Sequence, residues 1–318
     1  MEYAVVADKL VKYYDDFMAV KGISFRVKKG EIFGFLGPNG AGKTTTVRML
    51  CGLARIDGGR AFIYNFDVAK ETTKVKKVIG VVPDISNLYM ELSCFDNLMF
   101  CAEMYGVPRS ERKEKVIELL EFFGLSDKKN AKFKTLSKGL KRRLVIAAAL
   151  VHDPKLLFLD EPTIGLDVKS KRQIWRLIHE LNKKGITIFL TTHNIYEAFK
   201  VCDRIAIINK GRIIAEGTPT ELRAMVSGNK VIELQVHPPI RDPRVFSEIP
   251  GVVGVRIGQD TIRLMVNDVI IALEAILKII RESNREIVVL NLTGADAEDI
   301  FVKIIDKDEE FERTKRVE

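Results

Sequence analysis

The chain has 318 residues, of which 47% are hydrophobic and 30% are charged, with a formal net charge of +8. This balance is typical of a globular protein long enough for two domains, and it excludes a disordered chain. Longer apolar runs such as 144–151 and 269–280 are too short, or too interrupted by charges, to cross a bilayer. No charged start followed by an apolar signal segment is present, so we expect a cytosolic protein.

Cysteines and basic residues set two further expectations. The cysteines lie far apart without metal-ligand spacing, which predicts free thiols at Cys51, Cys94, Cys101 and Cys202. A dense basic cluster comprises Lys132, Lys134, Lys138, Lys141, Arg142 and Arg143. Such a cluster could meet nucleic acid, acidic lipid headgroups or nucleotide phosphates, or it could be a solvated helix face.

Two predicted strands open the chain. Alternating apolar and polar residues over 4–10 and 22–27 indicate an antiparallel pair, with Tyr13 and Tyr14 between them. A tyrosine ring beside a nucleotide pocket can stack on adenine, although a loop tyrosine more often serves packing.

A glycine-rich segment follows, between an apolar run at 31–36 that suits a buried strand and a helical pattern at 45–50. Its glycines let backbone N–H groups approach one point, and the helix N-terminus adds partial positive charge. The segment therefore predicts a phosphate-binding loop, in which Lys43 would reach the β- and γ-phosphates and Thr44 would ligate Mg²⁺. The alternative is a glycine turn before a helix. The loop comprises Gly37, Pro38, Asn39, Gly40, Ala41, Gly42, Lys43, Thr44 and Thr45.

Helices are predicted after the strand candidates 62–64 and 78–82. Ser93 with Asp96 forms a capping box for a helix ending near 105, and Ser110 can cap another helix that ends at Gly124. A third helix, 140–151, begins at Leu136-Ser137-Lys138-Gly139. A serine at the N-cap with a glycine at the helix start makes a second potential anion site. Without other motifs, this pattern would indicate only a helix cap. We interpret about 84–151 as a helical insert in a nucleotide-binding core.

Two acidic residues follow the apolar run 156–159, which predicts a buried strand ending at Asp160 and Glu161. Adjacent carboxylates at a strand end are costly without a cation nearby. Asp160 would hold Mg²⁺ together with Thr44, and Glu161 would act as general base on the attacking water. The alternative is an acidic turn before Pro162.

A further buried strand, 186–190, leads to His193 at its carboxyl end. A histidine there can contact a γ-phosphate and position water. After a hairpin at 204–215 and a short helix from Thr218, residues 230–305 predict a small α+β, ferredoxin-like layer without a catalytic constellation. We interpret it as a regulatory or dimer-contact domain, and 306–318 as a charged, frayed tail.

Residues 1–226 resemble an ATP-binding-cassette (ABC) ATPase. The phosphate loop, the 136–139 signature, Asp160-Glu161, a loop at 165–167 and His193 occur in the family's order and spacing. The resemblance implies an α/β P-loop fold of ABC type, with a mixed sheet core, an antiparallel β subdomain and a helical insert. Tyr14 falls where the family places its adenine-stacking aromatic. The C-terminal part, with 297–301, is similar to the extension of drug and antibiotic exporter subunits.

The resemblance also implies ATP and Mg²⁺ as ligands and a head-to-tail dimer. In that dimer Ser137, Lys138 and Gly139 of one copy cap the ATP held by Lys43 of the other. The family further implies a separate transmembrane subunit, contacted around 84–96, and a location on the inner face of the membrane. No nucleic-acid partner is expected.

Two parts of the sequence depart from the family's pattern. Lys138 stands where the signature usually has its first glycine, and the neighbouring Leu140 stands where glutamine is common. Asp84 stands where a glutamine normally links Mg²⁺ and the attacking water to the membrane partner. We retain Lys138 as a ligand and Asp84 as a Mg²⁺ ligand through water. Two other functions stay open: a soluble ABC-type ATPase acting on ribosomes or DNA, and a nucleotide switch that does not hydrolyse ATP.

Overall fold

The structure is a computed structural model that describes residues 2–225, 230–240, 242, 244–258, 261–294 and 297–314. The chain divides into two compact units, Met1–Pro219 and Thr220–Glu318. The boundary expected at 226–230 includes residues 226–229, which lie outside the described residues.

A six-stranded sheet forms the centre of the first unit, in the order β10-β9-β3-β8-β7-β6. All its pairings are parallel except that of β10 with β9. Every residue of β3, β7 and β8 is buried, as expected for parallel strands covered on both faces. The strands are β3 Ile32–Leu36, β6 Ile79–Val82, β7 Leu156–Asp160, β8 Thr187–Thr192, β9 Arg204–Asn209 and β10 Arg212–Gly217.

A second, antiparallel sheet has the order β2-β1-β4-β5. One apolar core joins the two sheets: Phe25 of β2 stacks on Phe33 of β3, with ring centroids 5.7 Å apart, and also contacts Phe189 of β8. Helix α1, Lys43–Leu50, contributes Val47 and Leu50 to the same core. The strands are β1 Tyr3–Tyr14, β2 Phe17–Lys28, β4 Gly58–Ile63 and β5 Phe66–Asp67. The predicted mixed sheet core and antiparallel β subdomain are therefore confirmed.

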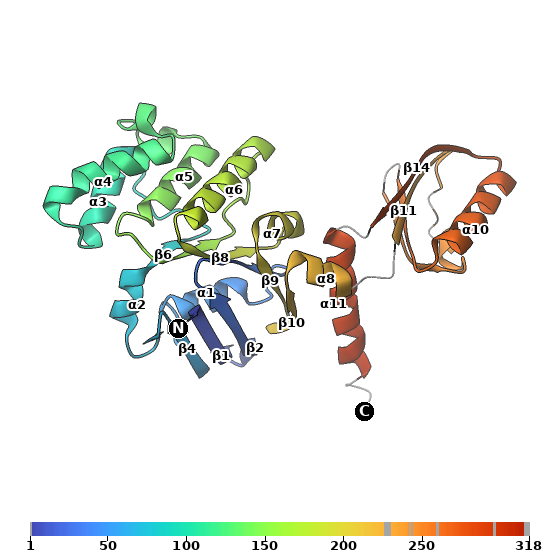
Figure 1. The fold of residues 1–318 in the computed structure, drawn as a ribbon, viewed down its shortest axis with the longest axis horizontal. Helices are drawn as coiled ribbons and strands as arrows, with labels where there is room; N and C mark the ends of the chain where they lie inside the picture. The colour runs from blue at the N-terminus through green and yellow to red at the C-terminus, as the bar shows by residue number, and fades with distance from the viewer. Residues whose placement is uncertain are drawn as a thin grey trace. The chain divides into compact units, whose positions relative to one another are not determined.

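Helices α3, α4 and α5 form the predicted insert between β6 and β7, at the upper left of Figure 1. Ser93 caps α3 as predicted, because its side chain accepts a hydrogen bond from the Asp96 N–H at 3.0 Å. The cap predicted for α4 is wrong: the helix begins at Arg109 after Pro108, so Ser110 lies inside it. The insert contains α3 Cys94–Met104, α4 Arg109–Phe122, two short 3-10 turns at Ser126–Lys128 and Phe133–Thr135, and α5 Lys138–Ala148.

Three other helices of this unit connect strands. Helix α2, Thr72–Val78, was not predicted; its only buried residue is Val75, so it lacks an apolar stripe of the usual width. Helix α6, Val168–Lys183, starts at Asp167, whose side chain accepts the Ser170 N–H at 2.9 Å. Helix α7, Ile195–Val201, follows β8 directly.

After helix α8, the second unit has the element order strand, helix, strand, strand, helix, strand, followed by one more helix. Its antiparallel sheet, in the order β12-β13-β11-β14, packs an apolar face that includes Leu234 and Leu264 with Ile276 of α10. This is the βαββαβ order of ferredoxin-like folds. The elements are α8 Pro219–Met225, β11 Lys230–His237, α9 Arg244–Ser247, β12 Val252–Ile257, β13 Ile262–Val266, α10 Val269–Glu282, β14 Glu286–Gly294 and α11 Ala297–Thr314.

The expected frayed tail at 306–318 is wrong for its first part, because α11 continues to Thr314. Alternating charges with few apolar residues suggested a tail, but they are equally compatible with a helix. Within the part of the chain that the structure describes, no helix is both long enough and apolar enough for a membrane span. The cysteines are free thiols, as predicted.

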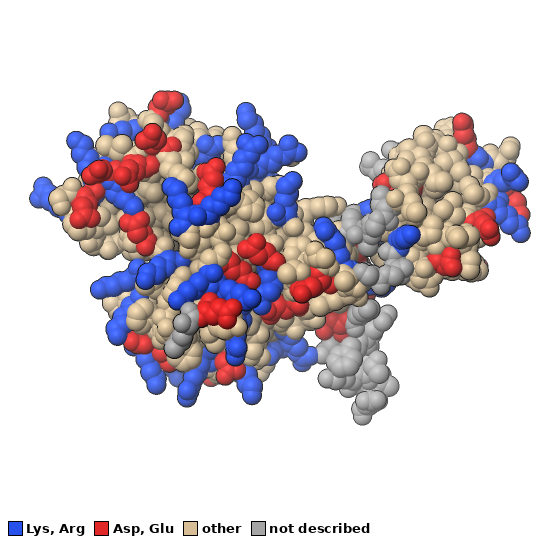
Figure 2. All heavy atoms as spheres, viewed as in Figure 1, with Lys and Arg blue, Asp and Glu red and all other residues tan. Residues whose placement is uncertain are grey.

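The basic cluster at 132–143 does not form one continuous face. Lys132 and Lys134 both pair with Glu91, at 3.3 and 2.8 Å. Lys141 lies over the Phe133 ring. In Figure 2, lysine and arginine side chains on the visible face of the first unit alternate with aspartate and glutamate. Three lysines of the cluster are therefore engaged by neighbouring side chains.

Arg142 is the clearest departure from that expectation, because it is buried. Its guanidinium donates hydrogen bonds to the main-chain oxygens of Pro83 at 2.6 Å, Glu161 at 3.0 Å and Asp84 at 3.3 Å. Burial lowers the pKa of Arg142, and the charges of Asp84 and Asp160 partly offset this effect. One side chain of α5 therefore ties together the chain segments that follow β6 and β7.

We expect Arg142→Met to lower the free energy of unfolding by about 2–4 kcal/mol, because carbonyl oxygens that accept from the guanidinium lose their donor. Urea unfolding followed by the fluorescence of Trp175, the single tryptophan, measures this change. The control is Lys141→Met on the same helix, expected within about 0.5 kcal/mol of the wild type. Equal unfolding midpoints for the two variants would contradict the structural role of Arg142.

Candidate functional site

The predicted phosphate loop lies between β3 and α1, and its glycines are required by close packing. A Cβ atom at Gly37 would lie 2.2 Å from the Ile208 carbonyl oxygen, and one at Gly42 would lie 2.8 Å from that of Ala19. Gly42 also has a φ of 108°, a value that favours glycine. The loop backbone therefore follows a path that side chains at these two positions would block.

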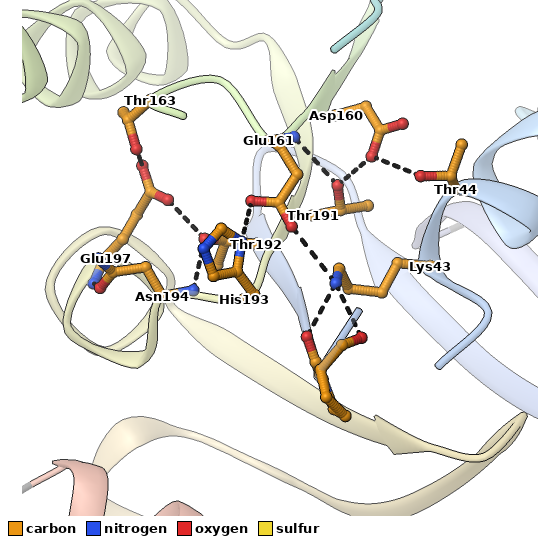
Figure 3. A network of polar contacts seen from close by, with 12 residues as sticks. Lys43, Thr44, Asp160, Glu161, Thr163, Thr191, Thr192, His193, Asn194 and Glu197 are labelled. Atoms are coloured by element: carbon orange, nitrogen blue, oxygen red, sulfur yellow. Dashed lines mark hydrogen bonds and ion pairs between the residues drawn. The ribbon is translucent and has the colours of Figure 1, made fainter. Parts of the chain in front are cut away.

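Lys43 extends back into this loop. Its side chain is 6% exposed, and its ammonium donates to the carbonyl oxygens of Gly37 at 2.8 Å and Pro38 at 3.2 Å. The same nitrogen lies 3.3 Å from Glu161 Oε1 (Figure 3). A buried ammonium is stable only with such partners, so the loop is organised around this charge.

Asp160 and Thr44 meet as predicted. The Thr44 hydroxyl donates to Asp160 Oδ1 at 3.3 Å, and the Thr191 hydroxyl also donates to that oxygen (Figure 3). Among the described residues, no group of three or more His, Cys, Asp or Glu side chains could hold a metal ion. One carboxylate and one hydroxyl nevertheless fit Mg²⁺, which takes oxygen ligands and commonly completes its shell with phosphates and water.

Glu161 lies between a cation and a histidine. Its Oε2 is 2.8 Å from His193 Nδ1, and its Oε1 faces Lys43 outside hydrogen-bond geometry. The backbone holds the side chain in this place: φ is 49°, in the left-handed region, and the N–H donates to the Thr191 carbonyl oxygen at 3.1 Å. The two predicted catalytic residues are therefore in direct contact.

Lys43, Thr44 and Glu161 line part of a cavity of about 490 Å³, whereas Asp160 and His193 contact these residues without lining it. Tyr14 lines it from the end of β1, where it is paired with Phe17 of β2, and both rings are exposed. The lining residues are Tyr14, Phe17, Ala19, Asn39, Gly40, Gly42, Lys43, Thr44, Thr45, Asp84, Glu161 and Ile164. Phe17 was not predicted as a site residue. It lies opposite Tyr14 across the turn between β1 and β2, and an aromatic residue so close in sequence to Tyr14 was a usable signal.

Asp84 reaches the cavity but is not bonded to the other predicted metal ligands. Its main-chain oxygen accepts from Arg142, and its side chain is exposed. This hydrogen bond fixes the backbone of Asp84 beside the cavity and does not involve its carboxylate.

The predicted signature lies outside this cavity in the single chain. Ser137 caps α5 by accepting the Leu140 N–H at 3.4 Å, and Ser137 and Lys138 are exposed. A Cβ atom at Gly139 would lie 2.6 Å from Ser170 Oγ, so a glycine lets α5 approach the start of α6. None of these three residues is among the residues that line the cavity.

Thr191 was missed by sequence reasoning, although it joins both acidic residues. Its hydroxyl bonds Asp160, and it accepts the Glu161 N–H at 3.2 Å. Two threonines at the end of a wholly buried strand were a usable signal, because buried hydroxyls need partners.

Comparison with known proteins agrees with this geometry. The family described as ABC transporter matches residues 20–164. The linearmycin resistance ATP-binding protein LnrL of Bacillus subtilis is 45% identical over 230 residues, which are 72% of this chain and 74% of that protein. The Nod factor export ATP-binding protein I of Rhizobium etli is 39% identical over 295 residues, 90% of this chain and 92% of that protein.

A solved structure shows the same architecture. That of cbiO1 from Clostridium perfringens, part of an ABC transporter complex, has a TM-score of 0.65 and 34% identity, and the match covers 70% of this chain and 92% of that one. The phosphate loop, the acidic pair and these relatives together lead to one conclusion. The chain belongs to the ATP-binding subunits of ABC transporters, which bind and hydrolyse ATP.

Proposed function

We propose that this chain is the ATP-hydrolysing subunit of an ABC exporter and drives a separate membrane subunit. The observation that carries the proposal is the position of Lys43, whose ammonium bonds the phosphate-loop carbonyls and lies 3.3 Å from Glu161. In this proposal Lys43, which would bind phosphate, lies beside Glu161, which would activate water. Two relatives, a linearmycin resistance protein and a Nod factor export protein, support the exporter assignment.

The loop and α1 would bind the triphosphate of ATP. Its oxygens would replace the carbonyl and carboxylate partners of Lys43, and the N-terminal N–H groups of α1 would face the same oxygens. Tyr14 lies on the cavity wall, exposed on one face, where its ring can stack on adenine.

Thr44 and Asp160 would hold Mg²⁺, and Asp84 would reach it through water from the same cavity. When bound, the ion supplies positive charge that offsets the charge developing on the β- and γ-phosphates. Thr191 fixes the Asp160 carboxylate toward Thr44, so the two ligands are already oriented.

Glu161 would accept a proton from the attacking water, and His193 would position that water and contact the γ-phosphate. Both side chains come from carboxyl ends of neighbouring parallel strands and are 2.8 Å apart. Glu161 lines the cavity, and His193 lies beside it, outside the lining residues. General-base positioning of this kind accelerates a reaction by roughly 10²–10⁴-fold.

A second copy of the chain would complete the site. Ser137 caps the 11-residue helix α5, and Lys138 and Gly139 begin it; the N-terminus of such a helix favours anions. Because they lie outside their own chain's cavity, their predicted role as ATP ligands requires ATP held by another copy. ATP binding would close this dimer, and hydrolysis would open it.

The membrane partner would dock on the surface that follows Asp84. This surface exposes Ile85 at 82%, Tyr89 at 54% and Met90 at 50%. Tyr89 packs edge to face on Phe100 of α3, with ring centroids 5.1 Å apart. Exposed apolar side chains grouped in this way are typical of a protein contact. Their proximity in sequence to Asp84 links the docking surface to the cavity, and the partner would hold the chain on the inner face of the membrane.

We predict that Glu161→Gln keeps ATP binding but loses turnover by about 10²–10⁴-fold, because the amide cannot accept the proton from water. Phosphate release measures turnover, and equilibrium binding of a fluorescent ATP analogue measures affinity. Glu180→Gln, an exposed change on α6, is the control and should hydrolyse ATP at the wild-type rate. Undiminished hydrolysis by Glu161→Gln would remove this residue from the role of base.

His193→Ala should lower turnover by about 10–100-fold, because the water and the Glu161 carboxylate both lose a positioning contact. Steady-state phosphate release over a range of ATP concentrations gives kcat and KM separately. His179→Ala serves as the matched control, since His179 is exposed on α6 away from the cavity. Equal kcat values for the two histidine variants would refute the assignment.

A further inference from the structure

We infer that Glu197 is a positioning residue for ATP hydrolysis, which holds the two chain segments that carry Glu161 and His193. The inference rests on the roles proposed above for those two residues. Glu197 itself does not line the cavity, so it acts through its neighbours and not by touching nucleotide.

Glu197 is a buried carboxylate, 1% exposed, in the first turn of α7. Its Oε1 accepts hydrogen bonds from the Thr163 hydroxyl at 2.8 Å and from Trp175 Nε1 at 2.9 Å. Its Oε2 accepts from the Thr192 hydroxyl at 2.6 Å (Figure 3). Its main-chain N–H donates to Asn194 Oδ1 at 3.0 Å, which fixes the start of the helix.

The positions of these donors connect the network to the site. Thr163 follows Glu161 by two residues, and Thr192 directly precedes His193. One carboxylate therefore links the segment after β7 to the end of β8. The contact of 2.8 Å between Glu161 and His193 joins the same two segments directly (Figure 3).

Packing alone does not account for a glutamate here. Burial of a carboxylate is costly unless several donors satisfy it, and an apolar side chain of similar volume could fill the same space. Three donors from three separate segments, all of them neutral, converge on this group. Such an arrangement specifies the relative position of the segments.

Glu197→Gln changes the hydrogen bonds at this position without changing the size of the side chain. Two donors meet at Oε1, so the amide oxygen would stay there, and the amide NH₂ would face the Thr192 hydroxyl. That hydroxyl already accepts the Asn194 N–H at 3.0 Å. The hydroxyl could accept the amide N–H with its second lone pair, but its own proton would then have no acceptor. Glu197→Gln therefore reverses and weakens the link to the His193 segment while the side chain keeps its size.

For the full-length chain we predict that Glu197→Gln lowers kcat for ATP by about 10–100-fold, since small displacements of catalytic groups carry losses of this order. KM and the affinity for a fluorescent ATP analogue should stay within about threefold, because Lys43 and its loop are not contacted by Glu197. Thr192→Val removes the donor to Glu197 together with the acceptor of the Asn194 N–H, and it should lower kcat in the same way. This variant tests the inference if Glu197→Gln does not fold.

Trp175→Phe is the matched control. It removes one donor to the same carboxylate, but Trp175 lies on α6, away from both segments that hold Glu161 and His193. We expect lower thermal stability by calorimetry, with kcat within about twofold of the wild type. A merely structural role of Glu197 would instead make the loss of kcat follow the loss of stability in both variants.

The outcomes separate this inference from the proposed function. Wild-type hydrolysis that is lost in Glu161→Gln but kept within about twofold in Glu197→Gln and Thr192→Val would overturn the inference alone. A loss of kcat in Trp175→Phe equal to that in Glu197→Gln would overturn it as well. A wild-type chain without ATP hydrolysis would overturn the proposed function, and this inference with it.

Discussion

The buried ammonium of Lys43 is the constraint on which the site depends. It bonds the Gly37 and Pro38 carbonyl oxygens and lies 3.3 Å from Glu161, so one charge connects the loop after β3 to the residue after β7. Such a charge is tolerated inside a protein only where acceptors surround it. The close approaches that require glycine at 37 and 42 follow from the same need, because they let the backbone turn its polar groups toward one point. A triphosphate offers the ammonium better partners than a carbonyl oxygen does.

Sheet topology brings these groups together. β8 lies between β3 and β7, all three are parallel, and their carboxyl ends therefore meet at one edge. That edge carries Lys43, the Asp160-Glu161 pair and His193, which are far apart in sequence. The strands themselves have no exposed residue, so the edge is held by a core rather than by surface contacts. A rigid support of this kind suits chemistry in which positioning and charge do most of the catalysis.

Sequence reasoning predicted this edge because its signals are local. Apolar runs indicated the buried strands, and glycines with a lysine indicated the loop between β3 and α1. What it missed depends on partners distant in sequence. Arg142 was placed in a basic cluster, since a helix pattern in so short a stretch does not tell which arginine points inward; the structure gives it three carbonyl acceptors. Glu197 was likewise ordinary in sequence, and only its three converging donors distinguish it from other glutamates.

The signature is connected to the loop that carries Glu161 in its own chain. Gly139 packs so closely on Ser170 that a Cβ atom would lie 2.6 Å from its hydroxyl, and that hydroxyl donates to Asp167 at 2.7 Å. The start of α5 and the start of α6 are therefore held together. Asp167 ends the loop that begins at Glu161 and passes Thr163, which Glu197 holds. In the proposed dimer, the signature of one copy contacts the ATP held by the other copy. Through these few residues, the same signature would be connected to Glu161 and His193 of its own copy. This connection supports a coupling of the two ATP sites through short, packed loops.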